Sequence, residues 1–475
     1  MDRNSPMGGT FFTAEMTNPC LCPTYSKLQR FLYNLISHLM EIHAQLPKTN
    51  LPRVLIIGGG FGGIQLARSL RKLPVQVVLI DRNNYHMFQP LLYQVATGGL
   101  EPDSIAVPLR TIFGKQDNLI FRMAEVEEIS PEKKQVRSSI GLIRYDYLVM
   151  ATGTQTNFFG MEGVEQNSLG MKTIPESLNL RSLILQNFEQ ALMADKEEES
   201  DLLKFVVVGG GPTGVETAGA LAELKRFVLP NDYPELDFRQ MEIHLVEAGS
   251  SLLAGMSDFS SREALKALRK LGVHVWLDTM VADYDGHLIT TKGDKTFEAA
   301  TMIWAAGVSG NVPDGIAEHA IARGRRLKVD SFNQIEGYEG LFAIGDVAYM
   351  ETDAYPQGHP QVAQVAIQQG ALLAKNLKAS LRGKTRTAFR YKDKGSMATI
   401  GRNKAVADLK NFSLKGLIAW MAWMVVHLMS LLGFRNKLVV LTNWTWSYFT
   451  YDKGTRLIIR PFQKRSKEPD QQLVS

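Results

Sequence analysis

Two stretches of this sequence combine closely spaced glycines with an acidic residue farther along the chain. In the first stretch, three glycines follow a β-branched apolar run in G-x-G-x-x-G spacing: Gly58, Gly60 and Gly63. The first permits a tight turn, the second lets the backbone approach a pyrophosphate, and the third lets the following helix pack on the strand. A second apolar run, residues 75–80, ends at Asp81, whose carboxylate can accept hydrogen bonds from a ribose. This order of strand, glycines, helix, strand and acid predicts a dinucleotide-binding unit, with the phosphates at the helix N-terminus.

The same order recurs farther along the chain. Residues 205–208 lead into three glycines, Gly209, Gly211 and Gly214, and the next predicted strand ends at Glu247. Two units that differ in detail indicate two different nucleotides, and in such a pair one holds a flavin and the other a nicotinamide. A carboxylate at Glu247 favours NADH, because it bonds a free 2′-hydroxyl and repels a 2′-phosphate.

Further turns of small residues follow other predicted strands. Thr152 and Gly153 end a strand that closes the first unit, and they form a turn that lets the backbone approach a ligand. Residues 340–344 read as another strand, which ends at a glycine and Asp346. The carboxylate of Asp346 could bind a ribitol hydroxyl. A helix is then expected to open within residues 361–370.

Composition narrows the class of protein. The chain has 475 residues, which is room for two or three domains, and its 45% hydrophobic and 21% charged residues fit an ordinary globular protein. The net charge of +5 is modest and no long basic tract is present, so nucleic acid is not an expected partner. Cys20 and Cys22 are the only cysteines, which excludes a disulfide scaffold and indicates a reducing compartment. No further ligands of the usual spacing accompany them, so no metal site is expected.

The region before the first glycine stretch predicts one element. Residues 27–46 carry leucines and other apolar side chains on one face of a predicted amphipathic helix, which Pro47 ends. The apolar part is short, is interrupted by polar residues and lacks a small-residue cleavage site, so we do not expect a signal peptide. The helix could pack on the body of the protein or lie on a membrane.

The C-terminal region has a different composition. Residues 417–433 are apolar and uncharged, at the lower limit of length for a membrane span. Four of the six tryptophans lie in or just after this segment: Trp420, Trp423, Trp444 and Trp446. Basic residues surround it: Lys415, Arg435, Lys437, Lys453, Arg456, Arg460, Lys464 and Arg465. Tryptophan and basic residues around apolar helices predict an anchor at the surface of a lipid bilayer, and the alternative is a core helix or the interface of a homodimer.

With these motifs in view, the chain from about Arg53 onward resembles the type II NADH dehydrogenases. These are non-proton-pumping NADH:quinone oxidoreductases within the pyridine nucleotide-disulfide oxidoreductase-like flavoproteins. The glycine loops mark only the broad superfamily, and the segment 363–368 together with the aromatic tail is more specific. The resemblance is carried by both glycine loops, Phe88-Gln89-Pro90-Leu91-Leu92-Tyr93-Gln94-Val95-Ala96-Thr97-Gly98, Gly345-Asp346 and Ala363-Gln364-Val365-Ala366-Ile367-Gln368.

The resemblance implies FAD in the first unit, NADH in the second and two-electron transfer to a membrane quinone. Motif and resemblance together assign to FAD the residues Gly58, Gly60, Gly63, Asp81, Asn83, Asn84, Val126, Thr152, Gly153, Asp346, Ala366 and Ile367. They assign to NADH the residues Gly209, Gly211, Gly214 and Glu247.

Two residues match family positions near flavin, nicotinamide and quinone. Glu216 could relay protons, or it could only stabilise the N-terminus of its helix. Gln364 could hydrogen-bond quinone or only orient the flavin. The family's basic residue in the C-terminal helix has no counterpart around Ala422, so no lysine is assigned there.

The predicted fold is α/β, with two Rossmann-like dinucleotide-binding domains and a C-terminal amphipathic helical region that anchors to membrane. The expected ranges are an extension at 1–50, FAD-binding parts at 51–165 and 321–395, an NADH-binding domain at 166–320 and a membrane-associated region at 396–475. The resemblance implies the cytoplasmic face of the inner cell membrane as the location. Related disulfide reductases and sulfide:quinone oxidoreductases need cysteines beside the flavin, and both cysteines here precede the first strand. Two other readings stay open: a soluble NADH-dependent reductase feeding ferredoxin or oxygen, and a non-catalytic redox sensor.

Overall fold

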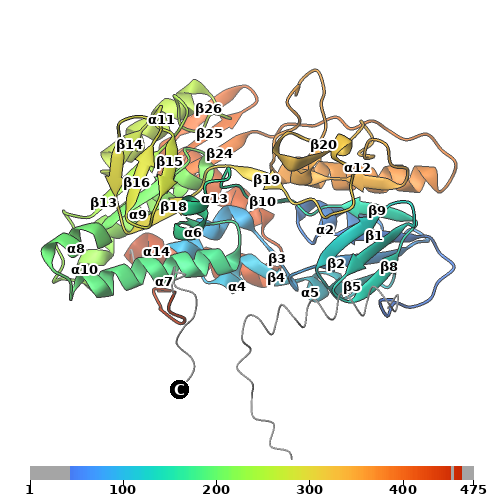
Figure 1. The fold of residues 1–475 in the computed structure, drawn as a ribbon, viewed down its shortest axis with the longest axis horizontal. Helices are drawn as coiled ribbons and strands as arrows, with labels where there is room; N and C mark the ends of the chain where they lie inside the picture. Colours follow the sequence, from blue (N-terminus) through green and yellow to red (C-terminus); the bar gives the residue numbers. More distant parts are fainter. Residues whose placement is uncertain (1–42, 451–453, 463–475) are drawn as a thin grey trace, which may run out of the picture.

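Two parallel sheets, side by side, form the two lobes of the protein (Figure 1). The structure is a computed structural model that describes residues 43–450 and 454–462. The α/β class predicted from the sequence is confirmed. Each lobe is built on a five-stranded sheet, and a third layer of strands and helices comes from the C-terminal region.

The first sheet has the strand order β22-β9-β1-β2-β5, with all neighbours parallel. Its strands are β1 (Arg53–Ile57), β2 (Gln76–Asp81), β5 (Leu119–Met123), β9 (Tyr147–Met150) and β22 (Leu341–Ala343). Helices α2 (Phe61–Ser69) and α12 (Ala363–Ser380) pack together on one face, where a Cβ at Gly370 would lie 2.6 Å from the Gly62 carbonyl oxygen. The antiparallel strands β6 (Val126–Ser130), β7 (Gln135–Ser138) and β8 (Gly141–Arg144) cover the other face. Apolar side chains therefore fill both faces of β1, as a parallel strand requires.

The second sheet repeats this plan in the order β11-β18-β12-β13-β14. Its strands are β11 (Leu169–Gly170), β12 (Lys204–Val208), β13 (Glu242–Val246), β14 (His274–Trp276) and β18 (Thr301–Trp304). The helices of this lobe are α7 (Ile174–Ala191), α9 (Pro212–Phe227) and α11 (Asp258–Lys270). The small sheet β15 (Val281–Tyr284), β16 (Leu288–Thr291) and β17 (Thr296–Glu298) covers the opposite face.

Two antiparallel strands connect the lobes. They are β10 (Thr154–Thr156) and β19 (Val308–Gly310), which leave the ends of the two sheets and pair with each other between them (Figure 1). The shorter elements are β3 (Tyr85–Met87), α3 (Leu92–Ala96), α4 (Pro102–Ile105), β4 (Ala106–Pro108), α5 (Leu109–Phe113), α6 (Glu162–Asn167), α8 (Lys196–Leu202), α10 (Leu229–Asp232), β20 (Ile321–Ala322), β21 (Arg326–Lys328) and β23 (Ala348–Tyr349).

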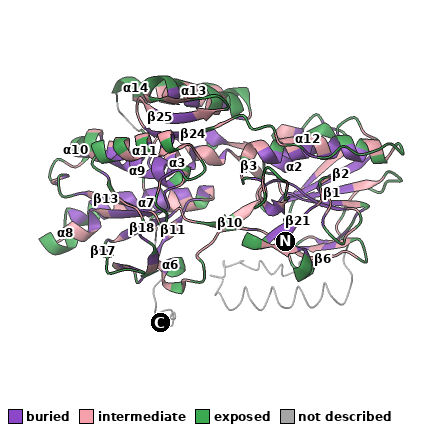
Figure 2. Cartoon of the chain, turned by 90° about the horizontal axis from the view of Figure 1, so that it is seen from above, coloured by how far each residue is buried: buried purple, intermediate pink, exposed green. Residues whose placement is uncertain are grey.

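The C-terminal region forms a layer that packs on the body. Its elements are β24 (Ser396–Gly401), β25 (Lys404–Leu409), β26 (Phe412–Lys415), α13 (Gly416–Ser430) and α14 (Phe434–Thr450). Helix α9 touches β24 closely, because Gly219 has no side chain and its Cβ position lies 2.0 Å from the Ile400 carbonyl oxygen. Trp423 of α13 and Val440 of α14 are fully buried in the core of the second lobe. Figure 2 shows the outer faces of α13 and α14 as exposed and their inner faces as buried. None of the helices in the described ranges combines the length and the apolar character that crossing a membrane requires.

The start of the described chain is extended. Residues 43–46, the end of the predicted N-terminal helix, are not helical, and the rest of that prediction lies outside the described residues. His43 bridges to Leu142, and the backbone N–H of Ala44 donates to the Leu142 carbonyl at 2.9 Å. Leu46 packs on the core of the first lobe. This short stretch is therefore held to the body by backbone pairing as well as by apolar contact.

Candidate functional site

A large cavity opens where the first lobe, the second lobe and the C-terminal layer meet; we call it the central cavity. Its volume is about 880 Å³, within the range of about 300–1,000 Å³ that is common for sites of organic ligands. Both glycine loops reach it, the first through Gly58 and Gly60 and the second through Pro212 and Thr213. His427 of α13 lines it from the C-terminal layer.

The first glycine loop follows from backbone geometry. Gly58 has φ +106°, a conformation that a side chain would strain, and its Cβ position lies 2.3 Å from the Ala151 carbonyl oxygen. A Cβ on Gly63 would lie 2.0 Å from the Gly58 oxygen, so Gly63 lets α2 pack against the turn and does not line the cavity. A Cβ on Gly60 would meet nothing within 4 Å. The open space at Gly60, beside the first N–H groups of α2, suits a phosphate.

Asp81, at the end of β2, holds this loop in place through hydrogen bonds. Asp81 Oδ2 accepts a hydrogen bond from the Gly59 N–H at 2.6 Å, and Oδ1 accepts one from the Asn83 N–H at 2.7 Å. Burial raises the pKa of the Asp81 carboxyl, and these two hydrogen bonds act in the opposite direction. Each carboxylate oxygen keeps a further lone pair, and Asp81 lines the cavity together with Asn83.

A charged cluster lines another wall of the cavity. Asp346 follows Gly345, whose φ of +75° requires the flexibility of glycine. Burial raises the pKa of the Asp346 carboxyl, while the cations Lys172 and Arg326 lower it. Burial also lowers the pKa of the Lys172 ammonium, which Asp346 and Glu176 raise. Lys172 lines the cavity, so this wall combines a carboxylate with an ammonium group.

The cavity gathers most of the residues predicted for FAD, but not all of them. It is lined by Gly58, Gly60, Asp81, Asn83, Val126, Thr152, Gly153, Asp346 and Ala366. Asn84 and Ile367 do not line it; the Asn84 carbonyl accepts a hydrogen bond from Leu109, and Ile367 is exposed at 39%. Gln364 also stands outside the lining, and its Nε2 donates to the Gly395 carbonyl at 3.2 Å. The Oε1 atom of Gln364 is buried without a hydrogen-bond partner.

The second glycine loop has the same internal geometry as the first. Gly209 has φ +112°, and a Cβ on Gly214 would lie 1.8 Å from the Gly209 oxygen. A Cβ on Gly211 would meet nothing within 4 Å. Glu247 Oε2 accepts from the Gly210 N–H, and its Oε1 accepts from the Gly249 N–H at 2.6 Å. A dinucleotide that followed this loop and α9 would reach the central cavity at Pro212 and Thr213.

Glu216 lies one turn into α9 and faces both the central cavity and a smaller pocket behind it. Its side chain is only 8% exposed. Oε1 accepts a hydrogen bond from the Thr399 N–H at 3.2 Å. Burial raises the pKa of the Glu216 carboxyl to about 8, against the opposing effects of Thr399 and the Trp423 indole. Glu216 therefore holds a proton at neutral pH inside the protein.

The His427 ring of the C-terminal layer lines the cavity, and Trp423 packs against that ring. The Trp423 and His427 rings stack with centroids 4.2 Å apart, and His427 lies edge-on to Phe88 at 6.0 Å. His427 Nδ1 lies 2.7 Å from the Trp423 carbonyl oxygen. Burial lowers the pKa of His427 to about 4, so its ring is neutral at pH 7. A neutral imidazole that donates through Nδ1 presents Nε2 as an acceptor.

Lys172 and His86 are among the cavity residues that the sequence analysis did not assign to the site. Lys172 lies far from every glycine motif, and only the path of the chain after β11 brings it to the cavity. His86 is buried at 4% exposure beside the first glycine loop, with Nδ1 3.1 Å from the Gly59 oxygen. No spacing rule assigns a role to a histidine at this position, so the sequence offered no signal for it.

Two family models match this chain. A family model described as pyridine nucleotide-disulphide oxidoreductase matches residues 52–370. A second, described as the NDH2 C-terminal domain, matches residues 394–450, which span β24 to α14.

Individual relatives cover most of the chain. A type II NADH:quinone oxidoreductase of Mycobacterium tuberculosis is 38% identical over 435 residues, which cover 88% of this chain and 92% of that protein. A type II NADH:quinone oxidoreductase of Haemophilus influenzae is 30% identical over 394 residues, covering 76% of this chain and 88% of that protein.

Solved structures share the fold. NDH2 from Plasmodium falciparum in complex with NADH matches with a TM-score of 0.79 at 22% identity, over 86% of this chain and all (100%) of that one. The sulfide:quinone oxidoreductase of Aquifex aeolicus matches with a TM-score of 0.66 at 21% identity, over 84% of this chain and 95% of that one.

Proposed function

The chain belongs to the type II NADH:quinone oxidoreductases, and from this premise we propose that it passes two electrons from NADH through FAD to a membrane quinone without pumping protons. The observation that carries the proposal is the central cavity. Two nucleotide-type glycine loops open into it, and Met397 and His427 of the C-terminal layer line it as well. Electron transfer from a water-soluble nucleotide to a lipid-soluble acceptor needs such a meeting point.

The residues of the first lobe fit FAD. Gly60 leaves open space at the N-terminus of α2 for the pyrophosphate, and Asp81 offers acceptors to a ribose. Asp346 lies at the wall where a ribitol chain would pass, and Lys172 beside it offers a hydrogen-bond donor. When bound, the flavin accepts a hydride from NADH and gives two electrons to quinone.

The second lobe fits NADH. Glu247 is held by two backbone N–H groups, so its carboxylate stands beside the loop where the adenosine ribose would lie. That carboxylate repels a 2′-phosphate, and we propose a preference for NADH over NADPH. Pro212 and Thr213 then direct the nicotinamide end toward the central cavity.

Glu216 is the proton carrier of the proposed site. Its carboxyl lines the central cavity and is protonated at neutral pH, so it can donate a proton where quinol forms. The neutral His427 offers an acceptor from the same wall. For Gln364 we propose a supporting role, because its Nε2 is committed to the Gly395 carbonyl.

We propose that α13 and α14 lie on the surface of a membrane. Their outward faces expose apolar side chains: Leu417, Ile418, Met421, Val425, Val426, Met429, Phe434, Leu438, Leu441, Trp446 and Phe449. Lys415, Arg435 and Lys437 flank this face, as in interfacial helices that bind anionic lipid. The lipid face is continuous with the layer that closes the central cavity, which gives quinone a route from acyl chains. We place the enzyme on the cytoplasmic face of the inner cell membrane, where NADH is made.

A homodimer remains compatible with the same apolar face. An apolar patch of this kind marks either a membrane or a protein interface. Sedimentation of the detergent-free and detergent-bound protein distinguishes the two, because a dimer interface would associate without lipid.

Purified protein with NADH and several quinones tests the proposal. We expect rapid NADH oxidation with a quinone analogue, slow oxidation with oxygen or ferredoxin, and release of yellow flavin on acid precipitation, because FAD is held without a covalent bond. Turnover with ferredoxin but not quinone would favour a soluble reductase, and flavin reduction without any turnover would favour a redox sensor.

A further inference from the structure

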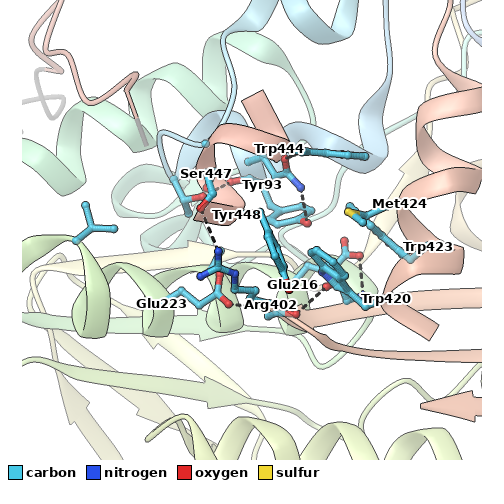
Figure 3. A pocket seen from close by; sticks show the side chains of 17 residues that line it. Tyr93, Glu216, Glu223, Arg402, Trp420, Trp423, Met424, Trp444, Ser447 and Tyr448 are labelled. Carbon is cyan, nitrogen blue, oxygen red and sulfur yellow. Dashed lines mark hydrogen bonds between the residues drawn. The ribbon is translucent and has the colours of Figure 1, made fainter. Parts of the chain in front are cut away.

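A smaller pocket lies behind Glu216, between α9, β24, α3 and the C-terminal helices (Figure 3). We call it the tail pocket and define it by Tyr93, Glu216, Glu223, Arg402, Trp423 and Tyr448. Its volume is about 120 Å³. Since one water takes about 30 Å³ in the liquid, the pocket has room for roughly four waters. Most of its lining is apolar, and the polar groups among the lining residues, which include Tyr93, Glu216 and Glu223, offer hydrogen-bond partners to waters.

Two carboxyl groups stand in the tail pocket on one face of α9. Glu216, Ala220 and Glu223 are spaced by one and two helical turns, and all three line the pocket. The same strand region holds both carboxyls, because the Thr399 N–H donates to Glu216 and the Arg402 N–H donates to Glu223. Glu216 is buried and also lines the central cavity, whereas Glu223 is partly exposed. The pair therefore joins the interior of the protein to its surface.

Tyr93 stands close to both carboxyls and lines both cavities. Its hydroxyl oxygen accepts a hydrogen bond from Gln94 Nε2 at 2.9 Å, and Trp444 Nε1 fixes Gln94 through a bond to Oε1 at 2.8 Å. The hydroxyl proton of Tyr93 is therefore left to donate elsewhere. Burial, Glu216 and Glu223 all raise the pKa of the Tyr93 phenol, so it stays neutral.

The proposed reaction requires one proton from solution in each turnover. A hydride carries one proton and two electrons, so NADH and quinone become NAD⁺ and quinol only when one further proton is added. Glu216 can give that proton once and must then be reloaded. His427 cannot substitute at neutral pH, since its pKa is lowered to about 4.

We propose that the tail pocket is a water-filled proton path that reloads Glu216 from the protein surface through Tyr93 and Glu223. The inference rests on the proposed function, because a reaction that consumes no proton needs no path. Arg402 lines the outer end of the pocket, and Lys404 lies near Glu223. Burial lowers the pKa of the Lys404 ammonium, Glu223 raises it, and the cations Lys270 and Arg226 lower it. The Arg402 guanidinium lies 4.3 Å above the Tyr448 ring and donates to the Ser447 carbonyl at 3.4 Å, which holds α14 over the pocket.

Three variants interrupt the path at different points. Tyr93→Phe removes the hydroxyl and keeps the ring, Glu223→Gln removes the outer carboxyl, and Ala220→Leu fills the space between the two carboxyls. Glu235→Gln is the matched control, because Glu235 is exposed and lies outside the pocket. FAD content and the rate of flavin reduction by NADH establish that each variant is folded, since hydride transfer needs no proton from the path.

The direct readout is deuteration of Glu216 in the FAD-loaded, oxidised enzyme. After transfer to D₂O, the infrared C=O stretching band of the protonated Glu216 carboxyl shifts. The band is assigned to Glu216 because it is absent from the Glu216→Gln variant. We expect Tyr93→Phe and Ala220→Leu to slow this shift by about tenfold or more. This factor is smaller than the rate effect that general acid–base groups typically have in catalysis. The Glu235→Gln control should exchange at the unaltered rate.

Turnover supplies a second readout. With saturating quinone analogue, the path variants should lose about tenfold in kcat above pH 8 and show a larger solvent isotope effect, while flavin reduction by NADH stays unchanged. Equal deuteration rates in all variants would mean that protons arrive through the central cavity, and the proposal would be wrong. If the unaltered protein showed no NADH:quinone turnover but deuteration was still slowed in the variants, the proposed function would be wrong, and the tail pocket would still be shown to conduct protons to Glu216.

Discussion

The stability of the Glu216→Gln variant tests directly whether Glu216 is buried as a protonated carboxyl. Burial raises the pKa of Glu216 from 4.5 to about 8. Between those values the folded protein holds one more proton than the unfolded chain, so the free energy of unfolding falls as pH rises. The stabilising contribution of the neutral carboxyl is complete below the unfolded pKa and is lost as pH rises through the folded one. Glutamine has a similar shape and does not titrate.

The size of the effect follows from the two pKa values. Each pH unit between them changes the free energy of unfolding by about 1.4 kcal/mol. From pH 5 to pH 9 the Glu216 contribution therefore falls by roughly 4 kcal/mol in the unaltered protein and by nothing in the variant. The free energy of unfolding of Glu216→Gln, relative to the unaltered protein, should rise by that amount over the same interval.

Urea unfolding of the FAD-loaded protein, followed by tryptophan fluorescence at pH 5, 7 and 9, measures this difference. Taking the difference between the two proteins cancels the titration of all other groups. The Glu235→Gln variant serves as a control and should track the unaltered protein at every pH. A difference between Glu216→Gln and the unaltered protein that does not change with pH would show that Glu216 is ionised in the folded chain, and its assignment as proton carrier would fail.

The remaining predictions concern the two glycine loops and the membrane face. Glu247→Gln should narrow the preference for NADH over NADPH by about tenfold, which corresponds to about 1.4 kcal/mol of lost repulsion. The ratio of kcat/KM for the two nucleotides measures this preference. Equal use of both nucleotides by the unaltered protein would contradict the prediction. Gly63→Ala should destabilise the protein by about 3 kcal/mol or more and lower its FAD content, because its Cβ would lie 2.0 Å from a carbonyl oxygen. Gly60→Ala should fold normally and only weaken FAD binding, and a similar loss of stability in both variants would refute the geometric reading. The double change Ile418→Asp with Val425→Asp should weaken vesicle binding about a hundredfold, from the loss of about 3 kcal/mol of apolar burial, and leave NADH-driven flavin reduction intact. Full retention on vesicles would show that these helices do not meet lipid.

Local backbone requirements made much of the fold readable from the sequence. A tight turn at positive φ needs glycine at Gly58 and Gly209, and close helix packing needs it at Gly63 and Gly214. These requirements involve residues only a few positions apart, so the spacing of the glycines in the sequence is enough to predict them. Continuous β-branched runs likewise indicated strands buried on both faces, and both sheets are parallel.

The C-terminal helices show that hydropathy does not predict which residues of an apolar segment are buried. Trp423 is 2% exposed and packs in the core, whereas Met421, two residues earlier, is 53% exposed. Both lie in the same uncharged run, and composition cannot say which face of a helix packs on the protein and which is exposed. The burial of Trp423 and Val440 makes this layer part of the body, so removing it would expose the core.

Residue types and their spacing were enough to predict the short-range constraints: the two glycine loops, the acids that follow them and the strands between. Which distant side chains meet depends on how the chain folds in three dimensions. The tertiary structure brought Lys172 to Asp346, set Tyr93 near both Glu216 and Glu223, and placed Thr399 on Glu216 across 183 positions of the chain. The physical reason is that a pKa or a proton path depends on burial and on partners in space, and neither leaves a periodic signal along the chain.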